Sequence, residues 1–213
     1  MINKFSRILM LFVSLVLVSP LSNSQTEIVA RIIVTMGKVE VVRANGIRET
    51  VQRRDIISAG DTVETPANGL VQLRFVDNSL VALGCASKLR VSSYSYRQVD
   101  ADQAELILLA GSLRTVFGQI ATDKYRLRIA DTVVQGSDAD FEVAIAPDGT
   151  QYFAVYVGAM TITNSQNQMK LGVGADADFG KLEPGFQFEE LILSPPILGS
   201  FNLNAANCTS QII

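Results

Sequence analysis

One stretch of the sequence, residues 60–91, restricts the possible folds of this chain more than any other. Apolar side chains alternate with polar ones from Val71 to Phe75, which is the period of a strand with one buried face. The triplet Asp77–Ser79 then interrupts the apolar run, and Asp and Asn tolerate the left-handed backbone of a tight turn. The apolar run resumes at Leu80–Leu83. Since an isolated hairpin is only marginally stable in water, the rest of the chain must cover its apolar face.

Strand signals recur along the chain at intervals of about 8 to 12 residues. Asn45-Gly46 is a strong hairpin signal, and Pro147-Asp148-Gly149 predicts a second turn between two apolar segments. We therefore expect an all-β chain, a single domain of short strands arranged as a solenoid-like roll or a β-sandwich. The expected strands, besides those of the central hairpin, are Gly37–Val41, Leu89–Tyr96, Ala104–Ala110, Tyr125–Ile129, Phe141–Ile145 and Tyr152–Val157.

Two groups of side chains allow both a functional and a structural interpretation. The cluster Arg53-Arg54-Asp55 is interpreted as a solvated edge, because charges guard strand edges against pairing with neighbours. Tyr94 and Tyr96 share one face of a predicted strand, and cross-strand packing is favoured over a binding role.

Three acids lie close together before Phe141, and we expect them in a solvated loop that includes Ser137-Asp138-Ala139. These acids are Asp131, Asp138 and Asp140. Calcium binding is the alternative, because hard cations prefer several oxygen ligands. The spacing differs from that of an EF-hand loop, which needs acids at alternate positions, a Gly and a late Glu.

The composition excludes several classes of function. The chain has no His, which removes the commonest general base and the commonest metal ligand. A carboxylate pair or a Ser–Lys pair remains open as catalytic machinery. The net charge of the whole chain is −3. Residues 1–24, which we expect to be removed, contain Lys4 and Arg7, so the mature chain would carry a net charge of −5. This acidity disfavours nucleic acid as a partner, because phosphate binding needs a basic face.

Residues 1–24 have the pattern of a secretory signal peptide. Lys4 and Arg7 supply the positive start, and Ile8–Val18 is an apolar run too short to span a membrane. Ser22-Asn23-Ser24 forms a cleavage site of the small-x-small type, so we expect Gln25 to begin the mature chain. The predicted location is periplasmic or secreted, with no membrane span in the mature chain.

Cys85 and Cys208 are the two cysteines of the chain, and both lie in the exported part. An oxidising compartment and an even count favour a disulfide between them. Such a bond would fasten the predicted tail, residues 194–213, to the core. The alternative is a reactive thiol, which is disfavoured because the chain has no His to activate it.

The residues of the central stretch resemble the FecR family of envelope domains. The resemblance rests on Gly60-Asp61, Thr65, the Val71–Phe75 alternation and Asp77-Asn78-Ser79. Leu108, Gly111, Leu113 and Arg114 match a further family stretch, whereas the Arg-Gly-Thr that usually precedes the aligned Phe141 is absent. The resemblance favours a solenoid-like roll over residues 25–193. The matching residues are turn and core positions, so it implies a fold more than an activity.

We expect an exported, stand-alone FecR-domain protein that acts as a non-catalytic interaction module in the cell envelope. Its partner would be an envelope protein or a cell-wall polymer, bound by β-rich surfaces. Family members at the cytoplasmic membrane relay signals to a sigma factor, and that role is not transferred because the sequence shows no span for it. No catalytic, cofactor or metal residue is assigned. The alternatives are a purely structural envelope protein and a glycan-active enzyme using two of the carboxylates Glu40, Glu105, Asp140 and Glu142.

Overall fold

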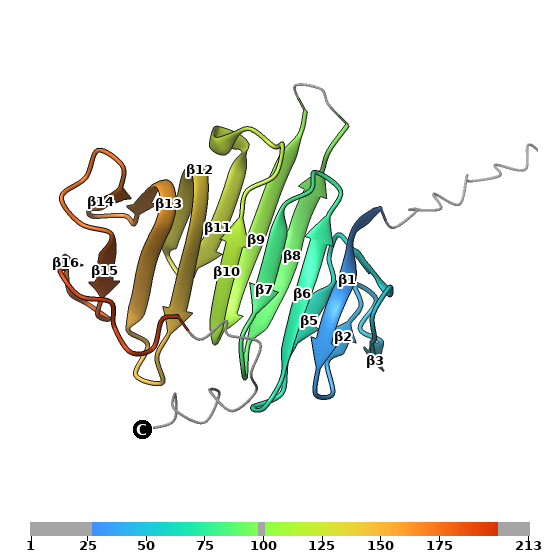
Figure 1. The fold of residues 1–213 in the computed structure, drawn as a ribbon. Coiled ribbons are helices and arrows are strands. Elements are labelled where there is room, and N and C mark those ends of the chain that lie inside the picture. The colour runs from blue at the N-terminus through green and yellow to red at the C-terminus, as the bar shows by residue number, and fades with distance from the viewer. Residues whose placement is uncertain (1–26, 98–100, 200–213) are drawn as a thin grey trace, which may run out of the picture.

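The computed structural model describes residues 27–97 and 101–199, and strands make up most of this part of the chain (Figure 1). All sixteen strands in it belong to one mixed sheet, which confirms the all-β prediction. A 3-10 turn, Thr122–Lys124, precedes β11. The strands are β1 Ile28–Met36, β2 Glu40–Val42, β3 Arg48–Thr50, β4 Ile56–Ser58, β5 Thr62–Glu64, β6 Leu70–Phe75, β7 Leu80–Leu83, β8 Lys88–Ser95, β9 Gln103–Ala110, β10 Ser112–Val116, β11 Tyr125–Ile129, β12 Thr132–Ile145, β13 Gln151–Thr163, β14 Gln168–Gly172, β15 Phe179–Leu182 and β16 Phe188–Leu191.

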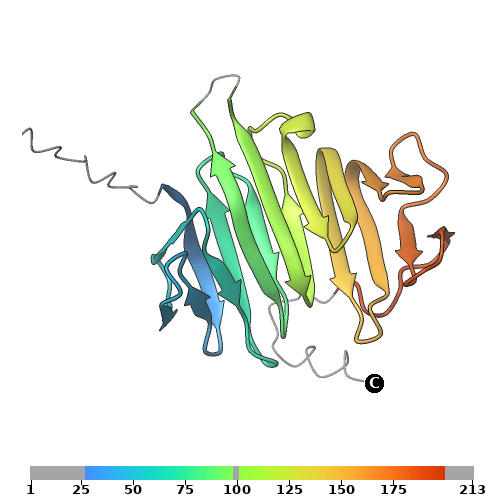
Figure 2. The ribbon, with the colours of Figure 1, turned by 180° about the vertical axis from the view of Figure 1, so that it is seen from behind.

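The sheet folds over on itself at the two longest strands, β12 and β13. The first half of β12 pairs with β11 (Val134 opposite Leu127), and its second half pairs with β10 (Val143 opposite Leu113). Two walls therefore diverge from this line. The front wall consists of β4, β1, β6, β7, β10 and the second half of β12, and it continues through β13 to β15 and β16 (Figure 1). The back wall consists of β3, β2, β5, β8, β9, β11 and the first half of β12, and it continues to β14 (Figure 2).

The chain passes repeatedly from one wall to the other. It runs from β1 in front to β2 and β3 behind, returns for β4, and crosses again for β5. The hairpin β6–β7 is in front, β8–β9 is behind, and β10 and β11 again take opposite walls. Successive turns of chain thus stack along one axis, which is the solenoid-like roll that the family resemblance favoured.

One apolar core fills the space between the walls. In β6, Val71, Leu73 and Phe75 are buried, whereas Gln72 and Arg74 point to the other side of the strand, as the alternation predicts. Tyr94 in β8 is also buried and stacks on Phe75 with ring centroids 4.4 Å apart, which confirms the packing interpretation for this residue. The same alternation on both walls gives the core its largest fully buried side chains, among them Tyr125, Phe141, Phe153, Leu83 and Leu106.

The three turns predicted most firmly are present. Asn78 has a φ of 69°, the left-handed conformation expected in the β6–β7 turn. Asn45-Gly46 lies between β2 and β3, where the N–H of Gly46 donates to the carbonyl of Arg43 at 2.8 Å. In the β12–β13 turn, the N–H of Thr150 donates to the Asp148 carboxylate at 2.9 Å.

The loop predicted at Ser137-Asp138-Ala139 is wrong. These residues lie within β12, and the sequence shows turn chemistry there because the strand carries a β-bulge. The register with β13 shifts between Ser137 and Asp140, and Asp138 has a φ of 46°. The bulge separates the half of β12 that belongs to the back wall from the half that belongs to the front wall. A bulge increases local twist and bends a strand, which suits the line where the sheet folds over.

Candidate interaction surface

The family-like Asp61 closes an open strand edge. It is 1% exposed, and its Oδ2 accepts hydrogen bonds from Ser58 N at 2.9 Å and from Arg43 Nη1 at 2.7 Å. Arg43 Nη1 also donates to the carbonyl of Ile56 at 2.9 Å. Ser58 and Ile56 belong to β4, the last strand of the front wall. Their bonds to side chains leave β4 poorly suited to pair with a further strand, which is how proteins guard sheet edges.

Asp77 is a second buried carboxylate, and its hydrogen bonds join the β6–β7 turn to the back wall. We call such buried, hydrogen-bonded groups internal ties. Its Oδ1 accepts hydrogen bonds from Ser79 Oγ at 2.7 Å and from the hydroxyl of Tyr94 in β8 at 2.6 Å. Burial, with smaller contributions from Tyr125 and Asp77, raises the pKa of Tyr94, so this phenol stays a neutral donor. A buried carboxylate is tolerated here because neighbouring hydroxyl and amide groups donate to it.

Thr65, Ser87 and Gly111 form the third set of internal ties. The hydroxyl of Thr65 donates to the carbonyl of Gly84 at 2.6 Å and accepts from Ser87 N at 2.8 Å. Ser87 Oγ in turn accepts from Ser112 N at 2.8 Å. Gly111 has a φ of 77°, and a β-carbon at this position would overlap Ser87. These positions therefore hold adjacent turns of the roll together.

On the outer face of the back wall, acids and bases form a connected network. Arg48 in β3 bonds Glu40 in β2 at 3.0 Å and also bonds Glu64 in β5 at 2.5 Å. Lys38 bonds Glu40 at 2.7 Å, and Lys88 in β8 bonds Glu64 at 2.8 Å. Hydrogen bonds from Lys38 and then Arg48 lower the pKa of Glu40, and those from Arg48 and then Lys88 lower that of Glu64. This surface satisfies most of its charge internally.

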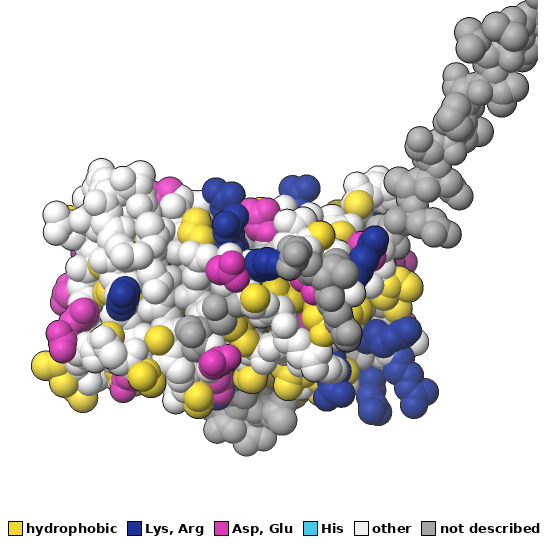
Figure 3. Space-filling model, turned by 90° about the horizontal axis from the view of Figure 1, so that it is seen from above, with side chains coloured by type: hydrophobic (Ala, Val, Ile, Leu, Met, Phe, Trp, Pro, Cys, Tyr) yellow, Lys and Arg dark blue, Asp and Glu magenta, His cyan; other side chains and the backbone are white. Residues whose placement is uncertain are grey.

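The outer face of the front wall carries an arginine cluster that lacks such partners. We define it as Arg31, Arg53, Arg54 and Arg74, all exposed. Arg31 in β1 lies directly opposite Arg74 in β6. Within the part of the chain that the structure describes, none of the four has an ion pair or a side-chain hydrogen bond. Figure 3 shows Lys and Arg side chains grouped at the end of the molecule that holds β1.

The middle of the front wall, on β10, β12 and β13, carries a polar cluster whose members bond each other. Arg114 makes two bonds to Asp140, at 2.8 and 2.7 Å, and its guanidinium lies 4.5 Å from the ring centroid of Tyr156. The hydroxyl of Tyr156 donates to Glu142 at 2.7 Å, and Gly199 N donates to the same carboxylate at 3.0 Å. Burial, followed by the bond to Glu142, raises the pKa of Tyr156. The end of the described chain thus crosses this face and covers Glu142.

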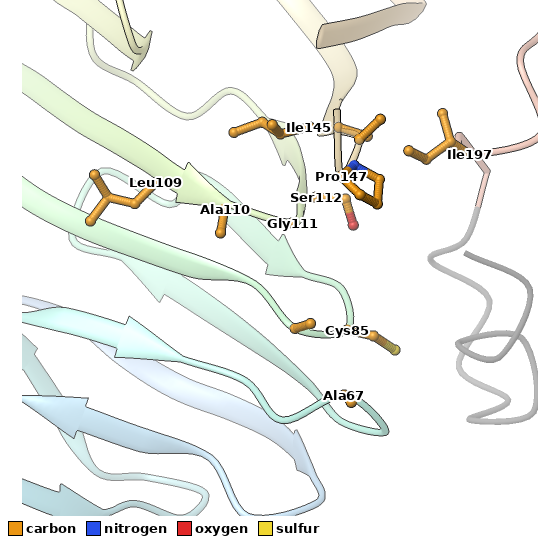
Figure 4. A pocket seen from close by; sticks show the side chains of 12 residues that line it. Ala67, Cys85, Leu109, Ala110, Gly111, Ser112, Ile145, Pro147 and Ile197 are labelled. Carbon is orange, nitrogen blue, oxygen red and sulfur yellow. The ribbon is translucent and has the colours of Figure 1, made fainter. Parts of the chain in front are cut away.

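An apolar groove lies where the β7–β8, β9–β10 and β12–β13 turns meet (Figure 4). Cys85, Gly111, Pro147 and Ile197 are among the residues that line it. Cys85 is 8% exposed and is not a free thiol. Cys208 lies outside the described residues, so its pairing with Cys85 stays a prediction.

The sequence matches one known family over the part of the chain that contains these buried contacts. The sequence profile described as "FecR protein" matches residues 61–161, which run from the tie at Asp61 to the middle of β13. Residues 61–161 match a FecR domain. The matched range contains the buried, hydrogen-bonded positions Asp61, Thr65 and Asp77 together with outward-facing residues such as Arg74.

Solved structures resemble the FecR domain only distantly. Two crystal structures of a "putative anti-sigma factor" from Parabacteroides distasonis are 13% and 14% identical, each with a TM-score of 0.49. Each alignment covers 61% of this chain, which spans 58% of the length of those proteins. A "Cell surface anchoring domain" is 32% identical over 29% of this chain and 82% of its own length, with a TM-score of 0.28. A search of curated proteins finds no match.

The carboxylates considered for catalysis are all bonded to neighbouring side chains or backbone. Glu40 bonds Lys38 and Arg48, Glu105 bonds Arg128 at 3.1 Å, and Asp140 bonds Arg114. Glu142 is fully buried beneath Gly199 and bonds Tyr156. The lowered pKa of Glu40 is opposite to what a general acid requires.

The acids considered for calcium binding do not converge on one site. Asp131 precedes β12, whereas Asp140 lies beyond the bulge in its second half, and no group of three or more acids among the described residues could hold a metal ion. Asp140 is also bound to Arg114. No helix among the described residues is long and apolar enough to cross a membrane.

Proposed function

We propose that this chain is an exported FecR-domain protein that acts as a non-catalytic interaction module in the cell envelope. It binds a partner through the outer face of its front wall. The observation that carries this proposal is that the polar side chains differ in burial and in pairing between the two walls. Asp61, Thr65 and Asp77 of the family pattern are buried. Among the described residues, the back wall pairs most of its charges, with Arg90 and Arg126 as exceptions on the separate strands β8 and β11, whereas the front wall presents four unpaired arginines together.

Exposed apolar side chains on the front wall support the same surface. Val116 in β10 is 41% exposed, Tyr156 in β13 is 39% exposed, and Val157 is 61% exposed. Val116 and Val157 both lie opposite Asp140 in the register of the sheet, so they flank one position on adjacent strands. Exposed aromatic and aliphatic side chains beside arginine are typical of the central part of protein interfaces.

Export rests on the sequence of residues 1–24, which lie outside the described residues. Cleavage after Ser24 would release a mature chain beginning at Gln25, in the periplasm or outside the cell. A disulfide between Cys85 and Cys208 requires the same oxidising compartment. Fractionation of the source cells and sequencing of the mature N-terminus test this part of the proposal.

Crosslinking in living source cells, followed by mass spectrometry of whatever is attached to the mature chain, tests the module. We expect one specific envelope protein to be recovered repeatedly. Recovery of cell-wall polymer alone would move the assignment to polymer binding. Absence of any attached species, together with turnover of a glycan by the purified chain, would overturn the proposal.

A further inference from the structure

We propose that the arginine cluster Arg31, Arg53, Arg54 and Arg74 is a binding site for an acidic segment of a partner protein. This inference rests on the proposed function and assigns it a position and a partner chemistry. The four side chains come from three parts of the chain, β1, β6 and the turn before β4. They share no bond with each other, so their proximity is a property of the fold alone.

The hydrogen bonding of β1 brings the four arginines together. β1 pairs with β6 on one side, which places Arg74 directly opposite Arg31. It pairs with β4 on its other side, where Ile56 lies opposite Arg31. The turn before β4 stays beside β1, because Arg54 N donates to the carbonyl of Ile32 and Ile32 N donates to that of Asp55, both at 2.9 Å. Arg31 is therefore central in the cluster.

Two local features of the cluster oppose folding. Like charges directly opposite each other on neighbouring strands are destabilising, and Arg31 and Arg74 form such a pair. Arg54 has a φ of 81°, in the left-handed region where glycine would be unstrained. The nearest acid in sequence, Asp55, forms no ion pair with these arginines among the described residues, and its carboxylate accepts the N–H of Gln52 at 2.9 Å. Guarding the edge of β4 does not explain these features, since Arg43 and Asp61 already close that edge.

The chemistry of the surroundings selects a protein segment over an extended polyanion. The whole chain is acidic, with a net charge of −3, so an anionic membrane surface or a long nucleic acid that extends beyond the cluster meets repulsion from the rest of the molecule, whereas a short acidic segment contacts the cluster alone. Exposed apolar side chains also border the cluster. Val76 follows the end of β6 and its N–H bonds Val29, and Ile28 begins β1; they are 45% and 44% exposed. A segment of carboxylates interspersed with apolar residues complements this mixture, and arginine is enriched at protein interfaces.

The test uses the mature chain and two probes at low ionic strength. One is a fluorescent peptide of alternating Glu and Leu, measured by anisotropy, and the other is vesicles containing anionic phospholipid, measured by co-sedimentation. The variants are Arg31→Gln/Arg74→Gln and Arg54→Gly. The control is Arg90→Gln/Arg126→Gln, which removes the same charge from β8 and β11 of the back wall.

We expect the peptide to bind the wild-type chain and the control alike, and Arg31→Gln/Arg74→Gln to weaken binding about tenfold or more. The same double variant should raise Tm by about 1 to 3 °C, because it removes a like-charge pair. Arg54→Gly should weaken binding and raise Tm by about 2 to 4 °C. Gain of stability with loss of binding is not expected from a purely structural group.

Three results would overturn the inference. These are an undetectable interaction with the peptide, equal weakening by the back-wall control, and binding to the vesicles in place of the peptide. The proposed function is tested separately, by crosslinking in cells. If Arg31→Gln/Arg74→Gln still captures the wild-type partner in full yield, the module stands and the arginine cluster is not its binding site.

Discussion

The two walls of the roll share one core but differ on their outer faces. On the back wall, Arg48 connects Glu40 and Glu64, and Lys38 and Lys88 extend the network. On the front wall, Arg31 and Arg74 oppose each other with no acid between them. Both faces belong to the same sheet, so the difference is not required by the fold. The difference lies in which outward-facing side chains each wall carries, and some of these, such as Arg74, fall within the matched range 61–161.

The largest effect is expected from the predicted disulfide, which would hold the C-terminal segment against the front wall. Closing a loop of about 120 residues contributes about 4 to 5 kcal/mol by chain entropy. Cys85→Ser and Cys208→Ser should each lower the free energy of unfolding by about this amount under oxidising conditions, measured with urea. The double variant should lose no more than either single variant. An unchanged urea midpoint in Cys208→Ser would exclude the bond.

The next largest effect concerns a tie that joins both walls. Asp77→Ala removes the acceptor of Ser79 and Tyr94 and leaves buried donors unpaired, so we expect a loss of about 3 kcal/mol in urea unfolding. Asn78→Gly, in the same turn, should be neutral or slightly stabilising, because glycine adopts the observed φ of 69° without strain. If the two variants lost equal stability, the turn and not the carboxylate would be the important element.

Asp61→Ala should open the edge of the front wall. Loss of the bonds to Arg43 and Ser58 should lower the free energy of unfolding by about 2 kcal/mol, and the exposed β4 edge should favour self-association on size-exclusion chromatography. Glu49→Ala is the matched control, because Glu49 pairs with the same Arg43 at the surface. A monomeric Asp61→Ala chain of wild-type stability would show that this tie does not guard the edge.

The Tm of Arg48→Gln, compared with that of Arg31→Gln, tests directly whether the arginines of the two walls differ in their contribution to stability. Removing Arg48 from the back-wall network should lower Tm by no more than about 3 °C, and high salt should abolish the difference. Arg31→Gln on the front wall should change Tm in the opposite direction. A fall in Tm for both variants would mean that the front-wall arginines have partners in solution.

The smallest effect is the pH dependence of the back-wall network. The folded-state pKa values of Glu40 and Glu64 lie below their ordinary 4.5, so the folded chain binds fewer protons than the unfolded chain near that pH. The stabilisation is fully present above about pH 4.5 and is lost as the pH falls through the folded-state values. Glu64→Gln should flatten the fall in Tm below pH 4.5, and an unchanged profile would contradict this assignment.

Local patterns in the sequence predicted the strands and turns but not their long-range pairing. The Val71–Phe75 alternation and Asp148-Gly149 are local signals, and the corresponding elements are present. The prediction failed at Ser137-Asp138-Ala139, because a bulge within a strand uses the same residue types as a turn. The Gly60-Asp61 motif was recognised from the sequence, but its role in closing the β4 edge depends on contacts to Arg43 and Ser58.

The candidate site could not be predicted from the sequence, because it also depends on long-range strand pairing. Arg31 and Arg74 are distant in the chain and become neighbours only through the register of β1 with β6. Arg53 and Arg54 were interpreted as an edge guard, because nothing local indicates that they lie beside Arg31. The absence of His limited the catalytic alternatives at the outset, but a binding surface has no comparable signature in composition.

Site-specific photo-crosslinking in the source cells tests the central claim most directly. One photoreactive residue replaces Val116, on β10 of the front wall, and in a second strain another replaces the exposed Arg126, on β11 of the back wall. We predict a specific protein adduct from position 116 and none from position 126. An adduct from position 126 alone, or the same adduct in equal yield from both positions, would contradict the assignment of function to the front wall.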